Sequence, residues 1–583
     1  MADFDTDVFI VGTGPTGATA ALALATYGVR CRLISRHRWL SNTPRAHITN
    51  QRAMEVFRDL GIDSEIGRYG SPWNLMGDTL FTTSLAGEEI ARIRTWGTGD
   101  DRYGDYLAAS PSGMMDVPQP YLESVILKNA AERGADVAFN TEYLSHLQDD
   151  DGVTVHLLDR LSGREYDVRA RYLIGADGAR SRIAEEIGLP IEGRMARAST
   201  AYVQFTADLG RYVEHRPSIL YWIVAPSAAY GEIGMGLLRA VRPWTEWITG
   251  WGYDPQQGEP DFSPSSLVDR IRGLIGDPEI AIEVGRTSTW QVNQAYATGY
   301  SVGRVFCAGD AVHRHPPSGG LGSNTSVQDA FNLAWKLAFV IREDADPSLL
   351  DSFSEERVPV GEQVVTRANR SRVEFGPLNA AITVPGSPDL VGSALAALRD
   401  PGPLGVATRA EVAAAVELKN YEFNAHGVEL NQRYRSGAII DDPALPAEQW
   451  PRDRELYVQP SCRPGAKLPH AWLVDGRGLR VSTLDLVGRG AFTVLTGLAG
   501  AAWVDAADGF ESVRSVVIGE DARDLYGYWR RVSDIAEGGV LLVRPDGYIA
   551  WRHAEPTPSD AEAAGLLERA LQRVLGRKPR RRP

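Results

Sequence analysis

A glycine-rich turn near the N-terminus restricts the fold of this chain more than any other feature. Asp7–Val11 predicts a short strand, Gly12–Gly17 (GTGPTG) follows at once, and the small residues of Ala18–Ala25 predict a helix. In this pattern the first glycine permits a tight turn, the second lets the backbone approach a pyrophosphate, and the third lets the helix pack on the strand. N–H groups at the helix N-terminus then face the phosphates. The expected contacts are Gly12, Gly14, Pro15, Thr16 and Gly17.

The apolar run Val29–Ser35 predicts the next parallel strand, whose end contacts a ribose in dinucleotide-binding folds. An acidic residue is usual about 20 residues after the glycines. Here Ser35 and Arg36 occupy that place. Serine can still hydrogen-bond a ribose hydroxyl, so we take both residues as candidate ligand contacts. A glycine turn without a ligand is the alternative.

Two later clusters favour a bound cofactor. The segment Tyr172–Ser181 (YLIGADGARS) follows a strand-like run, and Gly303–Asn324 reads as a strand and a glycine-rich turn before a helix. Asp310 follows a strand and a glycine, as expected of an acceptor for a sugar or ribityl hydroxyl. The later glycines let the chain pass close to a flat ring, and the helix after Ser323 points N–H groups at it. A flavin ring, which gains negative charge on reduction, suits such a helix end.

These three clusters, in this order, resemble the GxGxxG, DG and GD motifs of the class A flavoprotein aromatic hydroxylases. Three further segments are similar to the phenol hydroxylase / 2,4-dichlorophenol 6-monooxygenase branch of that family: Asn42–Arg52 (NTPRAHITNQR), Asp116–Glu123 (DVPQPYLE) and Trp290–Asn293 (WQVN). The resemblance is strongest over residues 5–440 and weaker beyond them.

The resemblance implies FAD as cofactor, with NADPH or NADH and O2 as co-substrates. The implied reaction adds a hydroxyl group to a small phenol-like or hydroxypyridine ring through a flavin C4a-hydroperoxide, in aromatic degradation or in natural-product tailoring. An epoxidase or a Baeyer–Villiger oxygenase on the same scaffold remains an alternative at this point. So does a flavin-binding scaffold without catalytic activity.

The resemblance also assigns residues to the cofactor. Arg45 and Gln119 match FAD contacts, Asp177 matches a residue near both FAD and the path of NAD(P)H, and Asp310 matches the ribityl contact. The loop around the isoalloxazine ring and its approach then comprise Gly309, Asp310, Pro317, Gly320, Leu321, Gly322, Ser323 and Asn324.

Several side chains are candidates for work on the substrate. His47 lies in the segment similar to phenol hydroxylases and is a candidate for hydrogen bonding or deprotonating a ring hydroxyl, and Pro317 is the second candidate catalytic residue. Tyr221, Trp222 and Trp290 are candidates for an aromatic pocket. A structural histidine and ordinary core aromatics are the alternatives.

The domain organisation is expected to be α/β. Residues 1–190 and 301–375 form a Rossmann-like FAD domain, and the segment near 75–115 belongs partly to the substrate side. Residues 191–300 form a substrate-binding sheet over the flavin, and residues 376–455 are helical or linker. Residues 456–583 are expected to form a thioredoxin-like domain that lacks CxxC and ends in a basic, frayed tail, Arg577–Arg582.

Composition excludes other classes of protein. The formal net charge of −14 disfavours nucleic-acid binding. No apolar stretch is long enough to span a membrane, and the acidic N-terminus does not resemble a signal peptide. Three scattered cysteines predict a reduced, cytoplasmic protein without a metal site. A homo-oligomer is expected.

Overall fold

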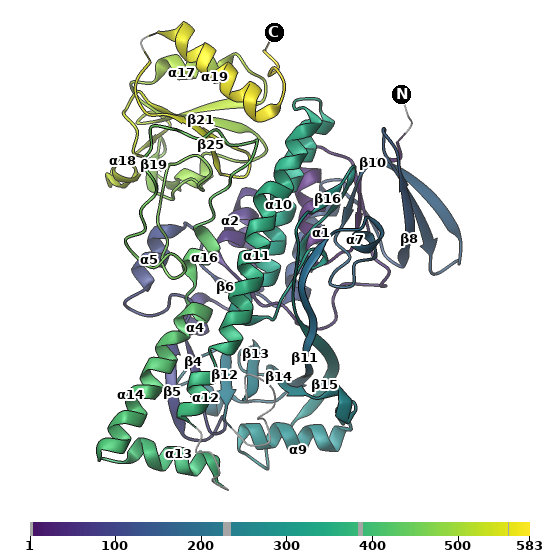
Figure 1. Ribbon diagram of the computed structural model, residues 1–583, viewed down its shortest axis with the longest axis vertical. Coiled ribbons are helices and arrows are strands. Elements are labelled where there is room, and N and C mark those ends of the chain that lie inside the picture. Colours follow the sequence, from purple (N-terminus) through teal and green to yellow (C-terminus); the bar gives the residue numbers. More distant parts are fainter. Residues whose placement is uncertain (1–3, 225–234, 383–388, 558, 583) are drawn as a thin grey trace.

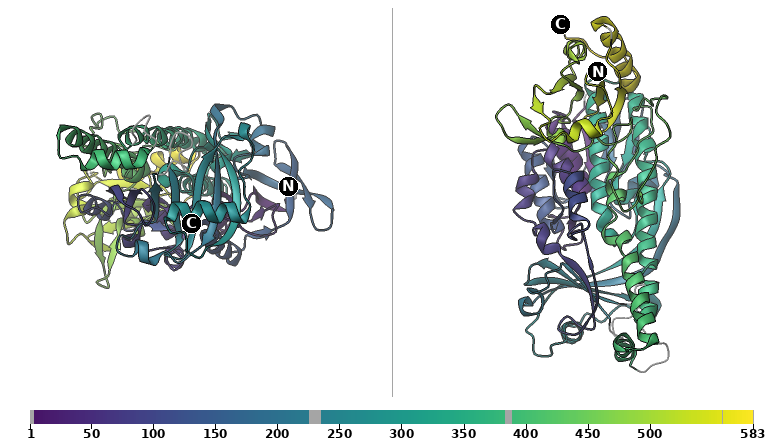
Figure 2. Two further views of the ribbon diagram at one scale, coloured as in Figure 1. Left: turned by 90° about the horizontal axis from the view of Figure 1, so that it is seen from below. Right: turned by 90° about the vertical axis from the view of Figure 1, so that its left-hand side faces the viewer.

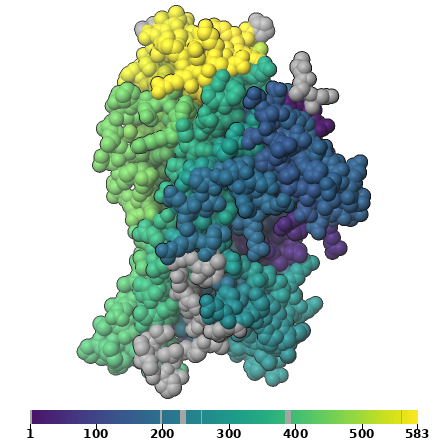
Figure 3. Space-filling view, turned by 45° about the vertical axis from the view of Figure 1, so that its right-hand side comes forward, coloured from purple at the N-terminus to yellow at the C-terminus, as the bar shows by residue number. Residues whose placement is uncertain are grey.

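The computed structural model describes residues 4–224, 235–382, 389–557 and 559–582. Its first part holds the predicted dinucleotide turn, a second sheet lies at one end of the long axis, and the C-terminal domain lies at the other (Figures 1 and 2). The long helices α10 (Leu321–Ile341) and α11 (Asp351–Val373) run between the two ends. Figure 3 shows the C-terminal domain, in yellow, capping the molecule.

The first sheet has a parallel core in which β1 lies between β2 and β10. Every residue of β1 is buried, which explains its continuous apolar run. Helix α1 (Pro15–Thr26) packs against α10 and α6 (Gln119–Glu132). In spatial order the strands are β16 (Ser301–Val302), β17 (Val305–Cys307), β10 (Glu165–Gly175), β1 (Thr6–Val11), β2 (Cys31–Ile34) and β7 (Asp136–Ala138), with β8 (Thr141–Gln148) and β9 (Val153–Asp159) beside β10.

The second sheet is mostly antiparallel and takes two strands from the first third of the chain. Its order is β18 (His313–Arg314), β15 (Glu283–Ala297), β11 (Ile191–Thr206), β14 (Glu246–Tyr253), β13 (Gly236–Arg242), β12 (Leu220–Ile223), β4 (Asp78–Thr82) and β5 (Glu89–Arg94). One face packs on α9 (Pro264–Ile275) around Trp247 and Phe205. The opposite face turns toward a two-stranded ribbon of the first domain, β3 (Ile48–Thr49) with β6 (Met115–Asp116).

Short helices and an irregular segment connect these parts. The helices are α2 (Gln51–Asp59), α3 (Asp63–Gly67), α4 (Trp73–Met76), α5 (Tyr103–Ala109), α7 (Arg182–Glu186), α8 (Gly210–Val213), α12 (Gly376–Ala381), α13 (Leu390–Arg399), α14 (Pro403–Leu418), α15 (Asn420–Phe423) and α16 (His426–Leu430). Residues 431–471 contain no helix or strand and lead to the C-terminal domain.

The C-terminal domain is a mixed sheet covered by helices. Its strand order is β20 (Arg480–Ser482), β19 (Trp472–Asp475), β23 (Ala522–Arg523), β22 (Val513–Ile518), β21 (Phe492–Gly497), β24 (Val540–Val543) and β25 (Ile549–His553). Helices α17 (Ala501–Asp508) and α19 (Asp560–Leu575) pack on each other. Helix α18 (Tyr528–Val532) lies between β23 and β24 in the chain.

The prediction of a frayed basic tail was wrong. Arg581 pairs with Phe510 in a β-bridge, and its guanidinium lies 2.7 Å from the Glu568 carboxylate. The N–H of Arg582 donates to the Gly509 carbonyl at 2.9 Å. Backbone pairing with residues 509 and 510 and the ion pair with Glu568 therefore hold the tail.

Candidate functional site

The glycine turn after β1 adopts the backbone that the sequence predicts. Gly12 has φ +110°, and a Cβ there would lie 2.1 Å from the Ala176 carbonyl oxygen, so no other residue fits. Gly14 caps α1 and faces open space, because a Cβ at this position would meet no atom within 4 Å. No side chain caps α1 and its first turn holds no acidic residue. Its free N–H groups therefore suit an anion.

Ser35 and Arg36 stand at the end of β2. Ser35 is buried, and its hydroxyl oxygen accepts a hydrogen bond from the His37 N–H at 3.2 Å. Arg36 is exposed. The serine hydroxyl proton remains available to a ligand, whereas its oxygen already holds the turn.

The Gly309-Asp310 turn lies between the N-terminal parts of α1 and α10. Gly309 has φ +67°, and a Cβ there would lie 2.2 Å from Thr16 Oγ1, which brings this turn against α1. The Asp310 side chain is exposed, and within the described ranges no protein group hydrogen-bonds to its carboxylate. Surrounding protein nonetheless removes much of its water, and this desolvation raises the pKa of Asp310. An acceptor of this kind is suited to sugar hydroxyls.

The predicted ring-binding loop leads directly into α10. Pro317 is exposed, Gly320 caps the helix with φ +65°, and no side chain caps its N-terminus. The Asn324 side chain bonds to β3 and the residue after it. Its amide oxygen accepts from the Asn50 N–H at 3.0 Å, and its amide nitrogen donates to the Ile48 carbonyl at 2.8 Å. The Asn324 side chain therefore ties the loop to β3. Leu321 is buried, whereas Gly322 and Ser323 are partly exposed.

The segment that carries Arg45 meets Gln119 at the N-terminus of α6. The Gln119 N–H donates to the Ala46 carbonyl at 2.8 Å, and its side-chain oxygen accepts from the Ala46 N–H at 3.3 Å. Arg45 is exposed, and its charge acts on Asp310 by lowering the pKa of that carboxyl against the effect of desolvation. Arg45 thus lies near Asp310. We call the region between these residues and the N-termini of α1 and α10 the crevice.

Asp177 has a structural task that the motif alone does not reveal. Its carboxylate accepts from the Ser181 hydroxyl at 2.5 Å and from the Arg182 N–H at 2.9 Å, at the N-terminus of α7. These bonds fix the turn after β10 that faces Gly12. The expected role near a pyridine nucleotide remains a prediction.

His47 belongs to a buried group of three charged or titratable side chains. Its Nε2 lies 2.7 Å from the Pro44 carbonyl and its Nδ1 lies 3.4 Å from Asp116 Oδ1, which accepts from Arg239 at 3.2 Å. Burial and the Arg239 cation lower the pKa of His47, against the opposing effect of Asp116. Burial would raise the pKa of Asp116, but Arg239 and His47 outweigh it and lower it. Arg239 is the most accessible of the three, with 14% of its side chain exposed against 2% for the others.

The structure separates the two aromatic residues that the sequence grouped on β12. Trp222 packs against Phe375 and belongs to the same apolar cluster as Ile48, on the face toward the first domain. Tyr221 points to the opposite face and packs near Trp247 in the core under α9. Placing Tyr221 in the pocket was therefore wrong, because neighbouring strand residues point to opposite faces.

Trp290 lies on the same sheet face as Trp222, with a partner that the sequence did not indicate. It stacks on Tyr202, with ring centroids 5.9 Å apart, and burial raises the pKa of Tyr202 to about 12. The register places Tyr202, Trp222 and Arg239 on one face of the sheet. Asp116, Arg239 and Tyr202 were missed, although Asp116 opens the DVPQP segment that carried the family resemblance.

The residues around the crevice fit a flavin dinucleotide. Two uncapped helix N-termini suit its pyrophosphate and the electron-rich edge of its ring, and among the described residues Asp310 is an unpartnered acceptor placed between them. Fold and crevice together define an FAD-binding oxidoreductase with a second domain that covers the cofactor.

Comparison with known proteins identifies the family. Residues 5–368 match the FAD binding domain model and residues 461–578 match the aromatic-ring hydroxylase C-terminal model. The chain belongs to the FAD-dependent aromatic-ring hydroxylases and is a flavoprotein monooxygenase.

Similar proteins cover the whole chain. The 2,4-dichlorophenol 6-monooxygenase of Cupriavidus pinatubonensis is 50% identical over 99% of this chain and 97% of its own. The phenol 2-monooxygenase of a Pseudomonas species is 45% identical over 96% and 91%. The crystal structure of the flavin-dependent monooxygenase PieE in complex with FAD and substrate has a TM-score of 0.93 at 42% identity, covering 98% of this chain and 100% of that one.

The residues that the structure describes contain neither a membrane-spanning helix nor a cluster of metal ligands. None of the helices there combines the length and apolar character of a membrane span. Within those same ranges, no three His, Cys, Asp or Glu side chains are grouped as metal ligands would be.

Proposed function

We propose that this enzyme hydroxylates a phenol-like or hydroxypyridine ring, with NADPH or NADH as reductant. In the balanced reaction, ring C–H, O2, NAD(P)H and a proton give ring C–OH, NAD(P)+ and water. The names of the two similar monooxygenases support a phenolic substrate. The observation that carries the proposal is the His47–Asp116–Arg239 group. Arg239 shares a sheet face with Tyr202 and Trp222, and the Ile48 carbonyl next to His47 accepts from Asn324 of the ring-binding loop. The epoxidase and Baeyer–Villiger alternatives have no such support.

We assign the cofactor to the crevice between α1 and α10. The turn from Gly12 to Gly17 would hold the pyrophosphate, Ser35 and Arg36 the adenosine ribose, Arg45 and Gln119 the phosphate side, and Asp310 the ribityl chain. Bound FAD supplies acceptance of hydride from NAD(P)H and activation of O2. The protein's own part is to position the ring and to exclude water.

Arg239 is suited to hold the substrate oxygen. A phenol hydroxyl has a pKa of about 10 in water, and a cation within a few ångströms lowers it by favouring the phenolate. A phenolate donates electron density into the ring and makes it a better nucleophile toward activated oxygen. Asp116 fixes the Arg239 guanidinium at 3.2 Å, so the cation is oriented before substrate arrives.

His47 is suited to receive the hydroxyl proton. Its lowered pKa keeps the imidazole neutral near neutral pH. Nε2–H then donates to the Pro44 carbonyl, so the lone pair lies on Nδ1, which faces Asp116. The Asp116 carboxylate beside it stabilises the imidazolium that forms. Because the Arg239 guanidinium cannot accept a proton, we propose that the proton passes to the Asp116 carboxylate and from there to His47 Nδ1, 3.4 Å away.

An assay with a panel of compounds tests the proposal. Holoenzyme is given phenol, 2,4-dichlorophenol, 2-hydroxypyridine or cyclohexanone, with NADPH or NADH in separate reactions, and the product mass is measured. We expect one added oxygen on at least one phenol or hydroxypyridine and none on cyclohexanone. Oxidation of NAD(P)H without oxygenated product from any ring would contradict the proposal.

The three cysteines are buried and have no disulfide partner in the described ranges, which supports a reducing, cytoplasmic compartment. The homo-oligomer remains a prediction.

A further inference from the structure

Asp329 lies directly behind the turn that carries Asp310. It stands on α10 with 1% of its side chain exposed. Its carboxylate accepts from the Gly309 N–H at 3.0 Å, from His313 Nε2 at 2.8 Å and from Arg357 Nε at 2.7 Å. A carboxylate with three donors has a single favourable orientation, so it holds the Gly309 N–H in place. The direction of the Asp310 side chain follows from that turn.

Arg357 fixes Asp329 from the side away from the crevice. It lies on α11 and is fully buried. Its Nη1 donates to the Tyr434 hydroxyl at 2.9 Å and to the Gln432 side-chain oxygen at 3.0 Å, and its Nη2 donates to the Thr325 carbonyl at 3.3 Å. The planar guanidinium therefore cannot rotate without breaking several bonds.

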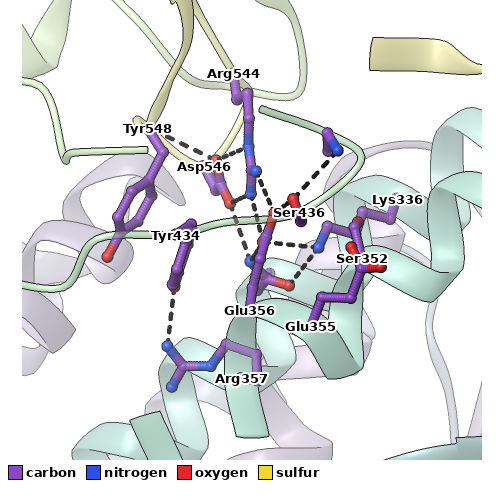
Figure 4. A network of polar contacts seen from close by, with 12 residues as sticks. Lys336, Ser352, Glu355, Glu356, Arg357, Tyr434, Ser436, Arg544, Asp546 and Tyr548 are labelled. Atoms are coloured by element: carbon purple, nitrogen blue, oxygen red, sulfur yellow. Dashed lines mark hydrogen bonds and ion pairs between the residues drawn. The ribbon is translucent and has the colours of Figure 1, made fainter. Parts of the chain in front are cut away.

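The residues that hold Arg357 are themselves held by the C-terminal domain. Tyr434 stacks on Tyr548, with ring centroids 4.0 Å apart, and the Tyr548 hydroxyl donates to Gln432 at 3.1 Å. Figure 4 shows Tyr434 between Tyr548 and Arg357. The loop of Tyr548 is fixed to α11 by Arg544, whose Nη2 lies 2.9 Å from Glu356 Oε2.

We infer that Asp329 is a positioning residue for FAD, and that the C-terminal domain strengthens FAD binding through Tyr434 and Arg357. The inference rests on the proposed contact between Asp310 and the ribityl chain. A chain of buried, directional bonds joins the domain to the turn behind the crevice. Because coupling between sites is reciprocal, FAD must also stabilise the docked C-terminal domain.

The mildest test removes one hydroxyl. Tyr434→Phe keeps the stacking on Tyr548 but deletes an acceptor of Arg357, and we expect the Kd for FAD to rise roughly three- to tenfold. The matched control is Tyr221→Phe, which removes a buried hydroxyl from the far face of the second sheet and should leave the Kd unchanged. FAD is titrated into apoprotein by fluorescence, and the unfolding midpoint of each apoprotein is measured. An unchanged Kd in folded Tyr434→Phe would overturn the inference.

Variants of the two aspartates separate this inference from the proposed cofactor site. Asp329→Asn keeps an oxygen for the Gly309 N–H, so it should bind FAD more weakly than wild type but more tightly than Asp329→Ala, with an altered visible circular dichroism of the bound flavin. Asp310→Ala should lose FAD. If Asp310→Ala binds FAD normally, the proposed site fails. If Asp310→Ala loses FAD but both Asp329 variants bind it normally, only the positioning role fails.

Hydrogen exchange tests the reciprocal effect in the wild-type enzyme. Amides of residues 544–548 are followed with and without FAD. Slower exchange in the holoenzyme is expected, since FAD and the docked domain stabilise each other. Equal exchange rates in both states would overturn the role of the C-terminal domain.

Discussion

Polar groups lack side-chain partners in the cofactor crevice but are paired at the junction between α11 and the C-terminal domain. In the crevice, Asp310 and the N-termini of α1 and α10 lack side-chain partners among the residues that the structure describes. At the junction, Glu356 is fully buried and accepts bonds from Arg544 and Lys336 (Figure 4). It also accepts a bond from Asn332. Burial of a charge is costly unless it is paired, so a fully paired network is structural. Unpaired groups collected in one crevice instead indicate a ligand.

The largest expected effect comes from removing the unpaired Asp310 carboxylate in the crevice. Asp310→Ala should yield a folded protein that contains almost no FAD, because the ribityl hydroxyls lose their acceptor. The ratio of visible to ultraviolet absorbance of the purified protein measures this. Asp151→Ala removes an exposed carboxyl from a distant turn and should keep the wild-type ratio. Normal flavin content in the first variant would refute the assignment of Asp310.

A matched change at the junction should affect stability instead. Glu356→Gln leaves Arg544 and Lys336 short of a counter-charge, and we expect the free energy of unfolding to fall by about 3–5 kcal/mol. Urea unfolding monitored by circular dichroism measures it. The neighbouring exposed Glu355 provides the control, since Glu355→Gln should change stability by less than about 1 kcal/mol. Equal stability of the two variants would show that the network contributes nothing.

On the substrate side, a change at Arg239 should separate binding of FAD from catalysis. Arg239→Gln removes the cation proposed to hold the phenolate, and kcat should fall roughly 100-fold or more while flavin content stays normal. Arg242→Gln, on the same strand but stacked over Tyr121, is the control. Steady-state product formation decides the matter, and unchanged kcat in Arg239→Gln would remove this residue from the reaction.

The pH dependence of kcat tests the proposed role of His47 as the base. Its pKa is lowered, so the neutral base is present above that pKa, and activity should fall about tenfold per pH unit below it. Asp116 raises the pKa of His47, so Asp116→Asn should move the acid limb to lower pH. His47→Gln should lack the limb. A limb that moves upward in Asp116→Asn would contradict the assignment.

The sequence predicted the crevice better than the substrate pocket. Gly12 and Gly309 need backbone conformations that only glycine adopts readily, so the turns leave a local signature. Asp116 and Arg239 meet from β6 and β13, and no local pattern joins them. The face of Tyr221 depends on where α9 packs, which alternation alone does not reveal.

The smallest expected effect tests which faces of the second sheet Trp222 and Tyr221 occupy. Trp222→Phe should change KM for substituted phenols by roughly three- to tenfold, because a pocket wall loses part of its ring. Tyr221→Phe should leave KM and kcat unchanged. Comparison of KM for phenol and 2,4-dichlorophenol measures the difference. A larger effect from Tyr221→Phe would reverse the proposed faces of the sheet.

The most direct test of the central claim is transfer of oxygen from O2 to the ring. FAD-loaded enzyme is supplied with NADPH, the phenol that gives product in the panel assay, and isotopically labelled O2, and the product is analysed by mass spectrometry. One labelled oxygen atom in the ring hydroxyl is the predicted result. A product that carries oxygen only from unlabelled water, or NADPH oxidation that yields peroxide without any hydroxylated ring, would contradict it.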